Sequence, residues 1–425
     1  MSLFQNKNIT VIGMGRSGLS AAKLLKAKGA RVSVSDGADM HKHEAVSAEL
    51  KAMGIGVELG RHSRSFIEGR DMVVVSPGVA FDALPCLWAQ ELGVEIISEI
   101  ELGFLCCPAE IIAITGTNGK TTTTTLIYEV LKASGRRAYC AGNIGTPFTQ
   151  EVLSMGQADY VSLEVSSFQL ERIKKFRPKV SVILNVTPDH MDRYASMDEY
   201  CAAKKRIFLN QGVGDWLIVN GQDEALKRMS QDSRAQVFFF DRSGHQGKFN
   251  QNQLAVLAVA KVLGISEDVV LGVFEAFKGV EHRMEYVGQL EGVEFINDSK
   301  ATNIDSTIWA LNNIKRPAVL IAGGRDKGSD FSGLRDLVRQ KVRSVVLVGE
   351  ASEQIYSAWK GVLPCHKVKK FEEAVELAYQ SAKTGECVLL SPMCKSFDMF
   401  ADYEHRGRIF KDIVNHLCRD NKCHK

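Results

Sequence analysis

The chain lacks the features that mark secreted, membrane-spanning or nucleic-acid-binding proteins. Its ten cysteines are scattered and include no C-x-x-C pair, which argues against a disulfide framework and a standard zinc site. No apolar run is long enough to span a bilayer, and the first residues lead into a glycine loop where a secretory signal has a cleavage site. Lys and Arg number 53 against 50 Asp and Glu, too even a balance to attract nucleic acid or an anionic membrane. We therefore expect a cytoplasmic protein in which any phosphate binding is local.

The length and the pattern of apolar segments predict an α/β protein of three domains. A chain of 425 residues exceeds what one hydrophobic core serves. Short apolar strands alternate with helical stretches in three successive segments, which is typical of doubly wound parallel sheets covered on both faces. We expect an N-terminal domain over 1–98, a central domain over 99–280 and a C-terminal domain over 281–425 that opens with a hairpin.

A phosphate-binding loop is the strongest local motif. Residues 116–121 read GTNGKT, directly after an apolar strand predicted over 111–115 and at the start of a predicted helix. Glycines let backbone N–H groups face phosphate oxygens, Lys120 reaches the terminal phosphates, and the Thr121 hydroxyl can ligate magnesium. Ile114 stands where the general motif has its first glycine, so the loop is a shortened variant. A chance GKT in a strand-turn-helix is the competing interpretation.

Two glycine-containing turns follow predicted strands of the N-terminal segment. Gly13, Gly15 and Gly18 open a predicted helix, and Asp36 ends the next strand, which fits a dinucleotide fingerprint. A tight turn that packs the helix against the sheet explains the same glycines. Gly78 follows another strand, where open sheets bind ligands, although it also fits a simple turn. We expect a nucleotide-type ligand here and do not assign it to NAD.

Two polar side chains follow or end strands of the central segment. Glu164 lies in the apolar strand VSLEVSS, and His190 closes the segment NVTPDH after a second strand. A carboxylate inside an apolar strand has to be paired or bound to metal, whereas His190 fits a structural histidine equally well. If both strands flank that of the phosphate loop, their ends converge on the metal and the γ-phosphate.

Further stretches occur in a fixed order along nearly the whole chain, from about residue 8 to residue 410. They include GNIGTP, NVTPDHMDRY, AAKKRIF, EHRMEYV, NDSKATN, AGGRDKGSDF and LLSPMCKSFDMFADYEHRGRIF. With the glycine turn and the phosphate loop, they resemble the Mur ligase family of peptidoglycan synthesis. The resemblance implies a UDP-binding Rossmann-like domain, a central P-loop ATPase domain and a C-terminal Rossmann-like domain.

The resemblance also implies an activity, which is the ATP-dependent addition of D-glutamate to UDP-N-acetylmuramoyl-L-alanine. ATP and two magnesium ions are the implied cofactors, and a monomer without nucleic-acid or membrane partners is the implied state. In this family the acceptor carboxylate takes the γ-phosphoryl group, and the incoming amine displaces phosphate from the acyl phosphate. Such phosphoryl transfer needs mainly positioning and charge neutralisation.

The residue roles implied by the resemblance begin with four catalytic side chains, which are Lys120, His190, Lys204 and Lys300. Magnesium would be held by Thr121, Glu164, His190 and Lys204, the last as a carbamate that turns a repelling ammonium into an anionic ligand. The nucleotide would contact Gly116, Thr117, Asn118, Gly119, Lys120, Thr121, Thr122, Asn252, Arg283 and Asp298. The chain departs from the family at residues 248–250, where KFN replaces the expected histidine-asparagine pair.

The substrate-binding residues implied by the resemblance fall into two groups. The UDP-muramoyl substrate would contact Gly15, Arg16, Ser17, Asp36, Gly78 and Asn143. The D-glutamate pocket would contain Thr302, Lys327, Ser396 and Tyr403, with Tyr403 where the family often has phenylalanine. Lys327 is the expected counter-ion of a substrate carboxylate.

Other functions explain fewer of the motifs. A nicotinamide-dependent oxidoreductase accounts for the glycine turn and Asp36, but it leaves GTNGKT and NVTPDHMDRY without a purpose. A P-loop motor or switch usually carries the full spacing and needs no flanking Rossmann-like domains. A nucleotide sensor without enzymatic activity would be excluded by ATP turnover that depends on an amino acid. Among ligases, those that add L-alanine, a diamino acid or a dipeptide, or extend folate with glutamate, fit the DHMDRY run less well, and no DNPR motif is present.

Overall fold

The computed structural model describes residues 3–38, 44–80, 82–189, 191, 193–241, 248–326 and 328–420. His190 and Lys327, two of the expected site residues, lie outside the described residues. Contacts divide the chain into two compact units, the first formed by Met1–Val186 and Asp198–Phe277 and the second by Thr187–Met197 and Lys278–Lys425. Within the described ranges, no helix is long and apolar enough to cross a membrane.

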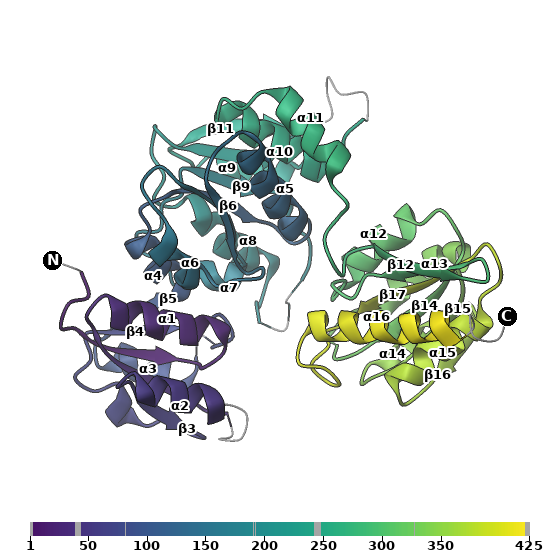
Figure 1. Ribbon diagram of the computed structural model, residues 1–425, viewed down its shortest axis with the longest axis horizontal. Coiled ribbons are helices and arrows are strands. Elements are labelled where there is room, and N and C mark those ends of the chain that lie inside the picture. The colour runs from purple at the N-terminus through teal and green to yellow at the C-terminus, as the bar shows by residue number, and fades with distance from the viewer. Residues whose placement is uncertain are drawn as a thin grey trace. The chain divides into compact units, whose positions relative to one another are not determined.

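The N-terminal part of the first unit is a parallel sheet of five strands in the order β3-β2-β1-β4-β5 (Figure 1). Its strands are β1 (Asn8–Ile12), β2 (Arg31–Asp36), β3 (Gly56–Leu59), β4 (Met72–Val75) and β5 (Glu95–Ser98). The helices α1 (Arg16–Ala27), α2 (Glu44–Ala52) and α3 (Leu84–Glu91) connect them. Strand order reverses between β1 and β4, so the carboxyl ends of these two strands border the crevice where open sheets bind ligands.

The central part of the first unit is a parallel sheet of six strands in the order β11-β10-β9-β6-β8-β7. Its strands are β6 (Glu110–Thr115), β7 (Ala138–Gly142), β8 (Tyr160–Glu164), β9 (Val180–Ile183), β10 (Trp216–Asn220) and β11 (Gln236–Phe240). The main helices are α5 (Lys120–Ala133), α8 (Met197–Lys205), α9 (Glu224–Ser230), α10 (Gln251–Val262) and α11 (Glu267–Ala276), with short α6 (Phe148–Glu151) and α7 (Ser167–Leu170). Because β8 and β9 both pair with β6, the condition under which their ends converge on the phosphate loop is met.

Alternating side chains of β6 supply two hydrophobic cores, one on each face of the central sheet. Ile111 and Ala113 pack into the core that contains Phe148. Ile112 and Ile114 pack into the opposite core, with residues of α5, α10 and α11. A strand that is apolar on both faces is what a helix-covered parallel sheet requires, and this explains the uninterrupted apolar run before the phosphate loop.

Buried carboxylates of α4 (Glu99–Cys106) join the two sheets of the first unit. Glu101 accepts three backbone N–H groups, those of Lys174, Lys175 and Phe176, at 2.7–3.0 Å. Glu99 accepts the backbone N–H and the hydroxyl of Thr149 at 2.7 and 2.6 Å, and burial raises the pKa of the Glu99 carboxyl. These contacts explain why the N-terminal and central sheets belong to one unit, while the predicted boundary at residue 98 stays a prediction.

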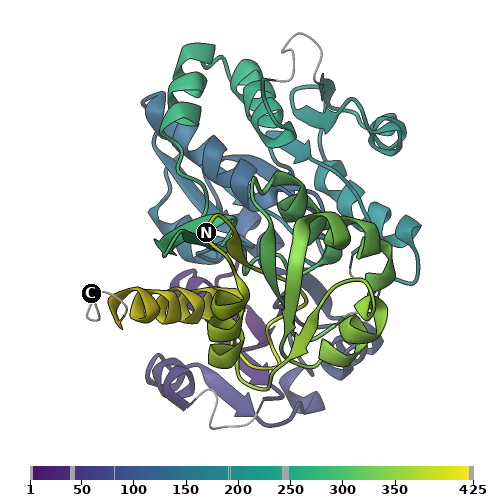
Figure 2. The same ribbon diagram turned by 90° about the vertical axis from the view of Figure 1, so that its right-hand side faces the viewer.

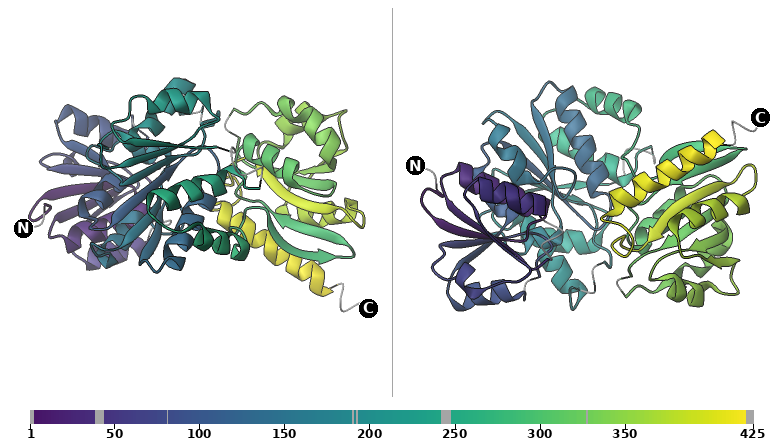
Figure 3. Two further views of the ribbon diagram at one scale, coloured as in Figure 1. Left: turned by 90° about the horizontal axis from the view of Figure 1, so that it is seen from above. Right: turned by 60° about the horizontal axis from the view of Figure 1, so that its bottom comes forward.

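The second unit contains a six-stranded sheet in the order β12-β13-β17-β14-β15-β16. Its strands are β12 (Glu285–Leu290), β13 (Val293–Asn297), β14 (Ala318–Gly323), β15 (Val342–Leu347), β16 (Cys365–Lys367) and β17 (Cys387–Met393). Its helices are α12 (Ile304–Asn313), α13 (Arg335–Lys341), α14 (Ser352–Trp359), α15 (Phe371–Ser381) and α16 (Tyr403–Asp420). The predicted hairpin is confirmed, since β12 and β13 pair antiparallel while the other pairs are parallel. Helix α16, yellow in Figures 2 and 3, packs against β12, β13 and α15.

A short segment that leaves the central sheet belongs to the second unit. Thr187–Met197 follows β9, yet it groups with the C-terminal residues. The Thr187 hydroxyl donates to Asp305 at 2.5 Å, and the Asn303 amide donates to Asp189 at 2.9 Å. The sequence run NVTPDHMDRY is therefore divided between the units, which no boundary near residue 280 predicts.

Candidate active site

The phosphate loop joins β6 to α5 and depends on two left-handed glycines. Gly116 has φ +153° and Gly119 has φ +85°, and such angles are costly for residues with a Cβ. A Cβ on Gly119 would also lie 2.3 Å from Oδ1 of Asn252. The structure therefore brings Asn252, at the start of α10, against the loop, as the nucleotide-binding prediction requires.

Lys120 and Thr121 begin α5 directly after the loop. The Lys120 ammonium donates to the carbonyl oxygens of Gly116 and Thr117 at 2.9 and 2.7 Å, so the side chain folds back across the loop. Thr121 is buried in the first helical turn, where the helix N-terminus adds positive potential. The arrangement is that of a cation and a hydroxyl gathered at an anion-binding helix end.

Asn185 holds the phosphate loop from the neighbouring strand, and sequence reasoning did not assign it a role. Its Oδ1 accepts the N–H groups of Thr117 and Asn118 at 3.1 and 2.9 Å, and its Nδ2 donates to the Asn118 carbonyl at 3.0 Å. Buried Tyr200 adds a hydroxyl 3.4 Å from that of Thr117. The position of Asn185 just after β9, beside β6, was the only pattern that could have indicated this contact.

Glu164 ends β8 beside the phosphate loop and is 1% exposed. The Asn143 amide donates to its Oε1 at 2.9 Å, and the backbone N–H of Asn143 donates to its carbonyl at the same distance. Asn143, expected at the muramoyl end of the substrate, thus lies next to an expected metal ligand. Hydroxyl and carboxylate oxygens are the hard donors that Mg²⁺ prefers, so Thr121 in the first turn of α5 and Glu164 at the end of β8 fit the implied ion.

Lys204 points from α8 to the phosphate loop, whereas Lys205 does not. The Lys204 side chain is 1% exposed, its Nζ donates to the Gly116 carbonyl at 2.9 Å, and it lies 4.4 Å from the ring centroid of Tyr200. Lys205 forms an ion pair with Asp232 at the surface. Of the two adjacent lysines, Lys204 is the one that contacts the phosphate loop, and its modification stays a prediction.

The N-terminal glycines are of two kinds: some are needed for close packing of the backbone, and others have free space where a side chain would be. A Cβ on Gly18 would lie 1.8 Å from the Gly13 carbonyl oxygen, so these two glycines allow α1 to pack closely on β1, as the tight-turn interpretation holds. Apart from their own chain neighbours, the described residues place no heavy atom within 4 Å of a Cβ built on Gly15 or Gly78. These open positions follow β1 and β4, at the reversal of strand order where a substrate is expected.

The Asp36 carboxylate bonds to the backbone of nearby turns in this structure. Its carboxylate accepts the backbone N–H groups of Met14 and Ala38 at 2.5 and 2.7 Å, which fixes the glycine turn against the end of β2. Arg16 donates to the Gly145 carbonyl at 3.3 Å, which brings the glycine turn to the GNIGTP loop. Arg16 and Asp36 therefore both belong to the turn after β1, Asp36 by bonding to its backbone and Arg16 by reaching the GNIGTP loop.

In the second unit, expected site residues cluster after β13. Lys300 donates to the Tyr403 hydroxyl at 2.8 Å and lies 4.6 Å from the ring centroid. The Tyr403 hydroxyl, which a phenylalanine would lack, thus accepts a hydrogen bond from Lys300, an expected catalytic lysine. Asp298 accepts the Ser391 hydroxyl at 2.8 Å, and burial raises the pKa of the Asp298 carboxyl to about 7.

A cavity of about 240 Å³ in the second unit has Thr302 in its wall. The other walls are formed by Pro188, Asp189 and Met191 of the NVTPDHMDRY segment and by residues 303–305 and 328–330. Lys327 is adjacent in sequence to the last group but lies outside the described residues, as does His190. The cavity is large enough for a small amino acid, and its walls combine polar side chains with the apolar Pro188, Met191 and Ile304.

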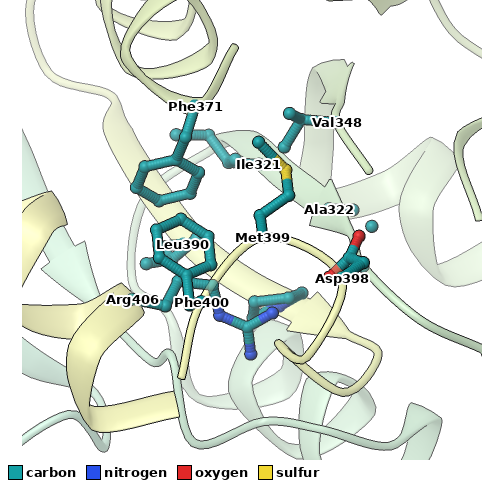
Figure 4. Close-up of a pocket in the computed structure, with 12 residues that line it drawn as sticks. Ile321, Ala322, Val348, Phe371, Leu390, Asp398, Met399, Phe400 and Arg406 are labelled. Carbon is teal, nitrogen blue, oxygen red and sulfur yellow. The ribbon is translucent and has the colours of Figure 1, made fainter. Parts of the chain in front are cut away.

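The loop that carries Ser396 is anchored by apolar side chains (Figure 4). Phe400 packs edge-on against Phe371 with ring centroids 4.9 Å apart, and the space left among the lining residues is about 10 Å³, room for one water molecule. Buried Arg406 donates to the Ser299 and Cys394 carbonyls at 2.8 and 3.3 Å. This packing fixes Ser396, which is 2% exposed, and it leaves no room for a ligand among these apolar groups.

Comparison with known proteins gives the chain its family. Three family models match it: the MurD-like N-terminal domain over residues 7–98, the Mur ligase middle domain over 114–271 and the Mur ligase glutamate ligase domain over 282–394. A curated relative from Koribacter versatilis is 38% identical over 98% of this chain and 99% of its own. The chain belongs to the Mur ligase family. Another relative of this Mur ligase, from Pelotomaculum thermopropionicum, is 41% identical over 97% of this chain and 98% of its own. Both relatives are named UDP-N-acetylmuramoylalanine–D-glutamate ligase.

Solved structures share the fold of this Mur ligase. UDP-N-acetylmuramate-alanine ligase from Thermotoga maritima has a TM-score of 0.61 at 20% identity and covers 97% of this chain and 100% of its own. MurF ligase from the same organism, in complex with ADP, has a TM-score of 0.59 at 15% identity and covers 97% of this chain and 96% of its own. The predicted α/β fold of three Mur ligase domains is confirmed. Arg283 and Asn252, both expected at the nucleotide, belong to different units, and the individual site assignments stay predictions.

Proposed function

We propose that this Mur ligase joins D-glutamate to UDP-N-acetylmuramoyl-L-alanine at the expense of ATP, in the synthesis of peptidoglycan precursors. The observation that carries the proposal is the match to ligases of that name at 38% and 41% identity over nearly the full length of both chains. The phosphate loop, with Lys120 and Thr121 at the start of α5 and Glu164 at the end of the neighbouring strand β8, supports an ATP-dependent step.

The proposed chemistry proceeds in two steps with an acyl phosphate between them. A carboxylate oxygen of the acceptor attacks the γ-phosphorus of ATP, and the bond to the β-γ bridging oxygen breaks to release ADP. The amine of D-glutamate then attacks the acyl carbon, loses a proton and expels inorganic phosphate. A carboxylate resists amines until it bears such a leaving group, so the enzyme's task is to position the groups and neutralise their charge.

Residues of this chain provide that positioning in the proposal. Lys120 and the loop N–H groups hold the terminal phosphates, and the open Gly15 and Gly78 positions receive the UDP-linked acceptor. Thr302, Lys327, Ser396 and Tyr403 hold D-glutamate, with Lys327 opposite a carboxylate of that substrate. Thr121, Glu164, His190 and Lys204 hold magnesium, which when bound neutralises the phosphate charge.

We also propose that Lys204 is carbamylated in the active enzyme. Its buried Nζ lies against the phosphate loop, where an ammonium beside Mg²⁺ is repulsive and a carbamate oxygen is a ligand. The neutral amine adds to CO₂, the N–C bond forms and a proton leaves. The competing interpretation is an unmodified lysine that donates to the Gly116 carbonyl.

The carbamate has a direct test. Activity should fall in CO₂-depleted buffer at mildly acidic pH and recover on addition of bicarbonate, while Lys204→Arg should be nearly inactive because guanidinium stays cationic. Lys205→Arg is the matched control, since Lys205 lies at the surface. A fully active Lys204→Arg enzyme, or density for a bare amine beside two magnesium ions, would reject the modification.

The proposed activity is tested by phosphate release with each UDP-muramoyl acceptor against a panel of amino acids. We expect turnover with UDP-N-acetylmuramoyl-L-alanine and D-glutamate only. Equal acceptance of L-glutamate or L-alanine would indicate a different specificity within the family. The proposal includes a cytoplasmic location and the absence of nucleic-acid and membrane partners, which the nearly balanced 53 basic and 50 acidic side chains support. It also includes a monomeric state, which light scattering of the purified enzyme checks.

A further inference from the structure

The backbone on both sides of Arg283 is left-handed at residues other than glycine. His282 has φ +62° and Met284 has φ +46°. Left-handed backbone is unfavourable for residues with a Cβ, and strain of this kind persists only where the surroundings over-determine it. Arg283, the residue proposed to contact the nucleotide, lies between these two strained positions.

Hydrogen bonds from three sides hold this backbone. The N–H of His282 donates to Oε2 of Glu285 at 2.9 Å, and the His282 carbonyl accepts the N–H of Lys300 at 3.1 Å. The N–H of Met284 donates to Oδ1 of Asp298 at 3.2 Å. The strained turn is therefore bonded to Asp298 and Lys300, two further residues of the proposed site.

The His282 ring packs against α16 at Gly407, where the missing side chain leaves a notch in the helix surface. The ring is buried, and its Nδ1 lies 2.9 Å from the Asn297 amide nitrogen. Burial lowers the pKa of His282, which favours the neutral ring whose Nδ1 accepts the amide hydrogen. A Cβ on Gly407 would lie 2.3 Å from the same Nδ1. Gly407 is inside a helix, where glycine is unfavourable, so its use here is to make room for the ring.

A metal site at this place conflicts with the charges already present. Glu281, His282 and Glu285 bring ligand atoms within 4.8 Å of one another. The Lys411 ammonium, however, lies 2.7 Å from Glu281 and 2.8 Å from Glu285. A cation from α16 thus already neutralises both carboxylates, and the ion pairs join α16 to the turn that carries Arg283.

We propose that His282 and Gly407 form a positioning pair, in which the ring seated in the α16 notch fixes the backbone that directs Arg283 toward the nucleotide. The proposal rests on the proposed ATP-dependent function, and the contact of Arg283 with the nucleotide is the one that the family resemblance implies. His282 acts through Arg283 and the turn, so the affinity for nucleotide should depend on it more than kcat does.

The test compares Gly407→Ala in two backgrounds, with ADP binding by calorimetry and the KM for ATP as readouts. In the wild-type background, the new methyl group displaces the ring, and we expect the Kd for ADP and the KM for ATP to rise at least tenfold with a smaller change in kcat. In a His282→Gly background, which already binds more weakly, the ring is absent and Gly407→Ala should change either value less than twofold. Gly272→Ala is the matched control, because Gly272 is also helical and has open space around its Cβ.

A second pair of variants keeps the test decisive if Gly407→Ala fails to fold. Asparagine tolerates left-handed backbone better than alanine does, but both lack the ring, so His282→Asn and His282→Ala should each raise the KM for ATP about tenfold, and a KM within threefold of wild type in His282→Asn would overturn the role of the ring. A lowered Tm with unchanged Kd and KM would reduce the pair to a structural role and overturn the proposal. Equal effects of Gly407→Ala in both backgrounds would do the same. If the wild type binds ADP but does not ligate D-glutamate, the proposed function fails while the binding comparison still decides the pair.

Discussion

Replacement of Asn185 by alanine should weaken ATP binding through the phosphate loop alone. The side chain makes three hydrogen bonds to Thr117 and Asn118, at 2.9–3.1 Å. A hydrogen bond contributes about 0.5–1.5 kcal/mol net, so the three together order the loop by about 1.5–4.5 kcal/mol. If about 1.5–3 kcal/mol of this has to be supplied by nucleotide binding in the variant, the KM for ATP rises about ten- to a hundredfold.

The assay is phosphate release at varied ATP with saturating acceptor and amino acid, combined with ADP binding by calorimetry. Asn210→Ala is the matched control, because the Asn210 amide donates to the carbonyls of Lys174 and Phe176 at 2.9 and 3.0 Å. These acceptors lie outside the phosphate loop, so the control should lower Tm by a comparable amount and leave the KM for ATP unchanged.

Two results would refute this reasoning. A KM for ATP within twofold of the wild-type value in Asn185→Ala would mean that the loop keeps its order without the side chain. A comparable rise in the KM for ATP in Asn210→Ala would mean that general loss of stability, and not the loop contact, causes the effect.

The other predictions concern charges at the proposed site. Lys120→Ala should abolish ATP-dependent ligation with an unchanged circular dichroism spectrum, because it removes a phosphate counter-charge and no core side chain; near-wild-type turnover would contradict the phosphate-loop assignment. Lys327→Ala should raise the KM for D-glutamate about ten- to a hundredfold, for a loss of about 1.5–3 kcal/mol, and an equal rise for ATP would oppose the assignment. Burial raises the pKa of Asp298 from 3.8 to about 7, so its contribution to stability is complete below pH 3.8 and is lost as pH rises through 7. The Tm of Asp298→Asn should therefore increase relative to wild type between about pH 5 and pH 8, and a constant difference in Tm would show that the group does not titrate there.

The central fold and the core of the candidate site could be predicted from local sequence. The apolar run before GTNGKT predicts a buried strand followed by a helix, and β6 and α5 occupy those places. Glu164 was singled out because a carboxylate in an apolar strand needs a partner, and it was placed near the loop on the condition that its strand flanks that of the loop, as β8 does by pairing with β6. These predictions succeed because they depend on residues close in the chain and on the parallel sheet rule.

Contacts between distant segments could not be predicted in this way. The role of Asn185 depends on the register that brings the residue after β9 to the phosphate loop. The left-handed backbone at His282 and Met284 is not marked by glycine or asparagine in the sequence. It is held by a local bond to Glu285, three residues further on, and by bonds to the more distant Asp298 and Lys300, and the distant contacts are not revealed by a single sequence.

The assignment of Thr187–Met197 to the second unit has a consequence for the design of protein fragments. A fragment that starts at Lys278 would contain the complete C-terminal sheet. It would omit Asp189 and Thr187, the hydrogen-bond partners of Asn303 and Asp305. It would also lack Pro188, Asp189 and Met191, one whole wall of the 240 Å³ cavity. Ligand screens on such a fragment would probe an incomplete pocket, whereas a fragment with residues 187–197 grafted on through a short linker would present the complete set of described lining residues.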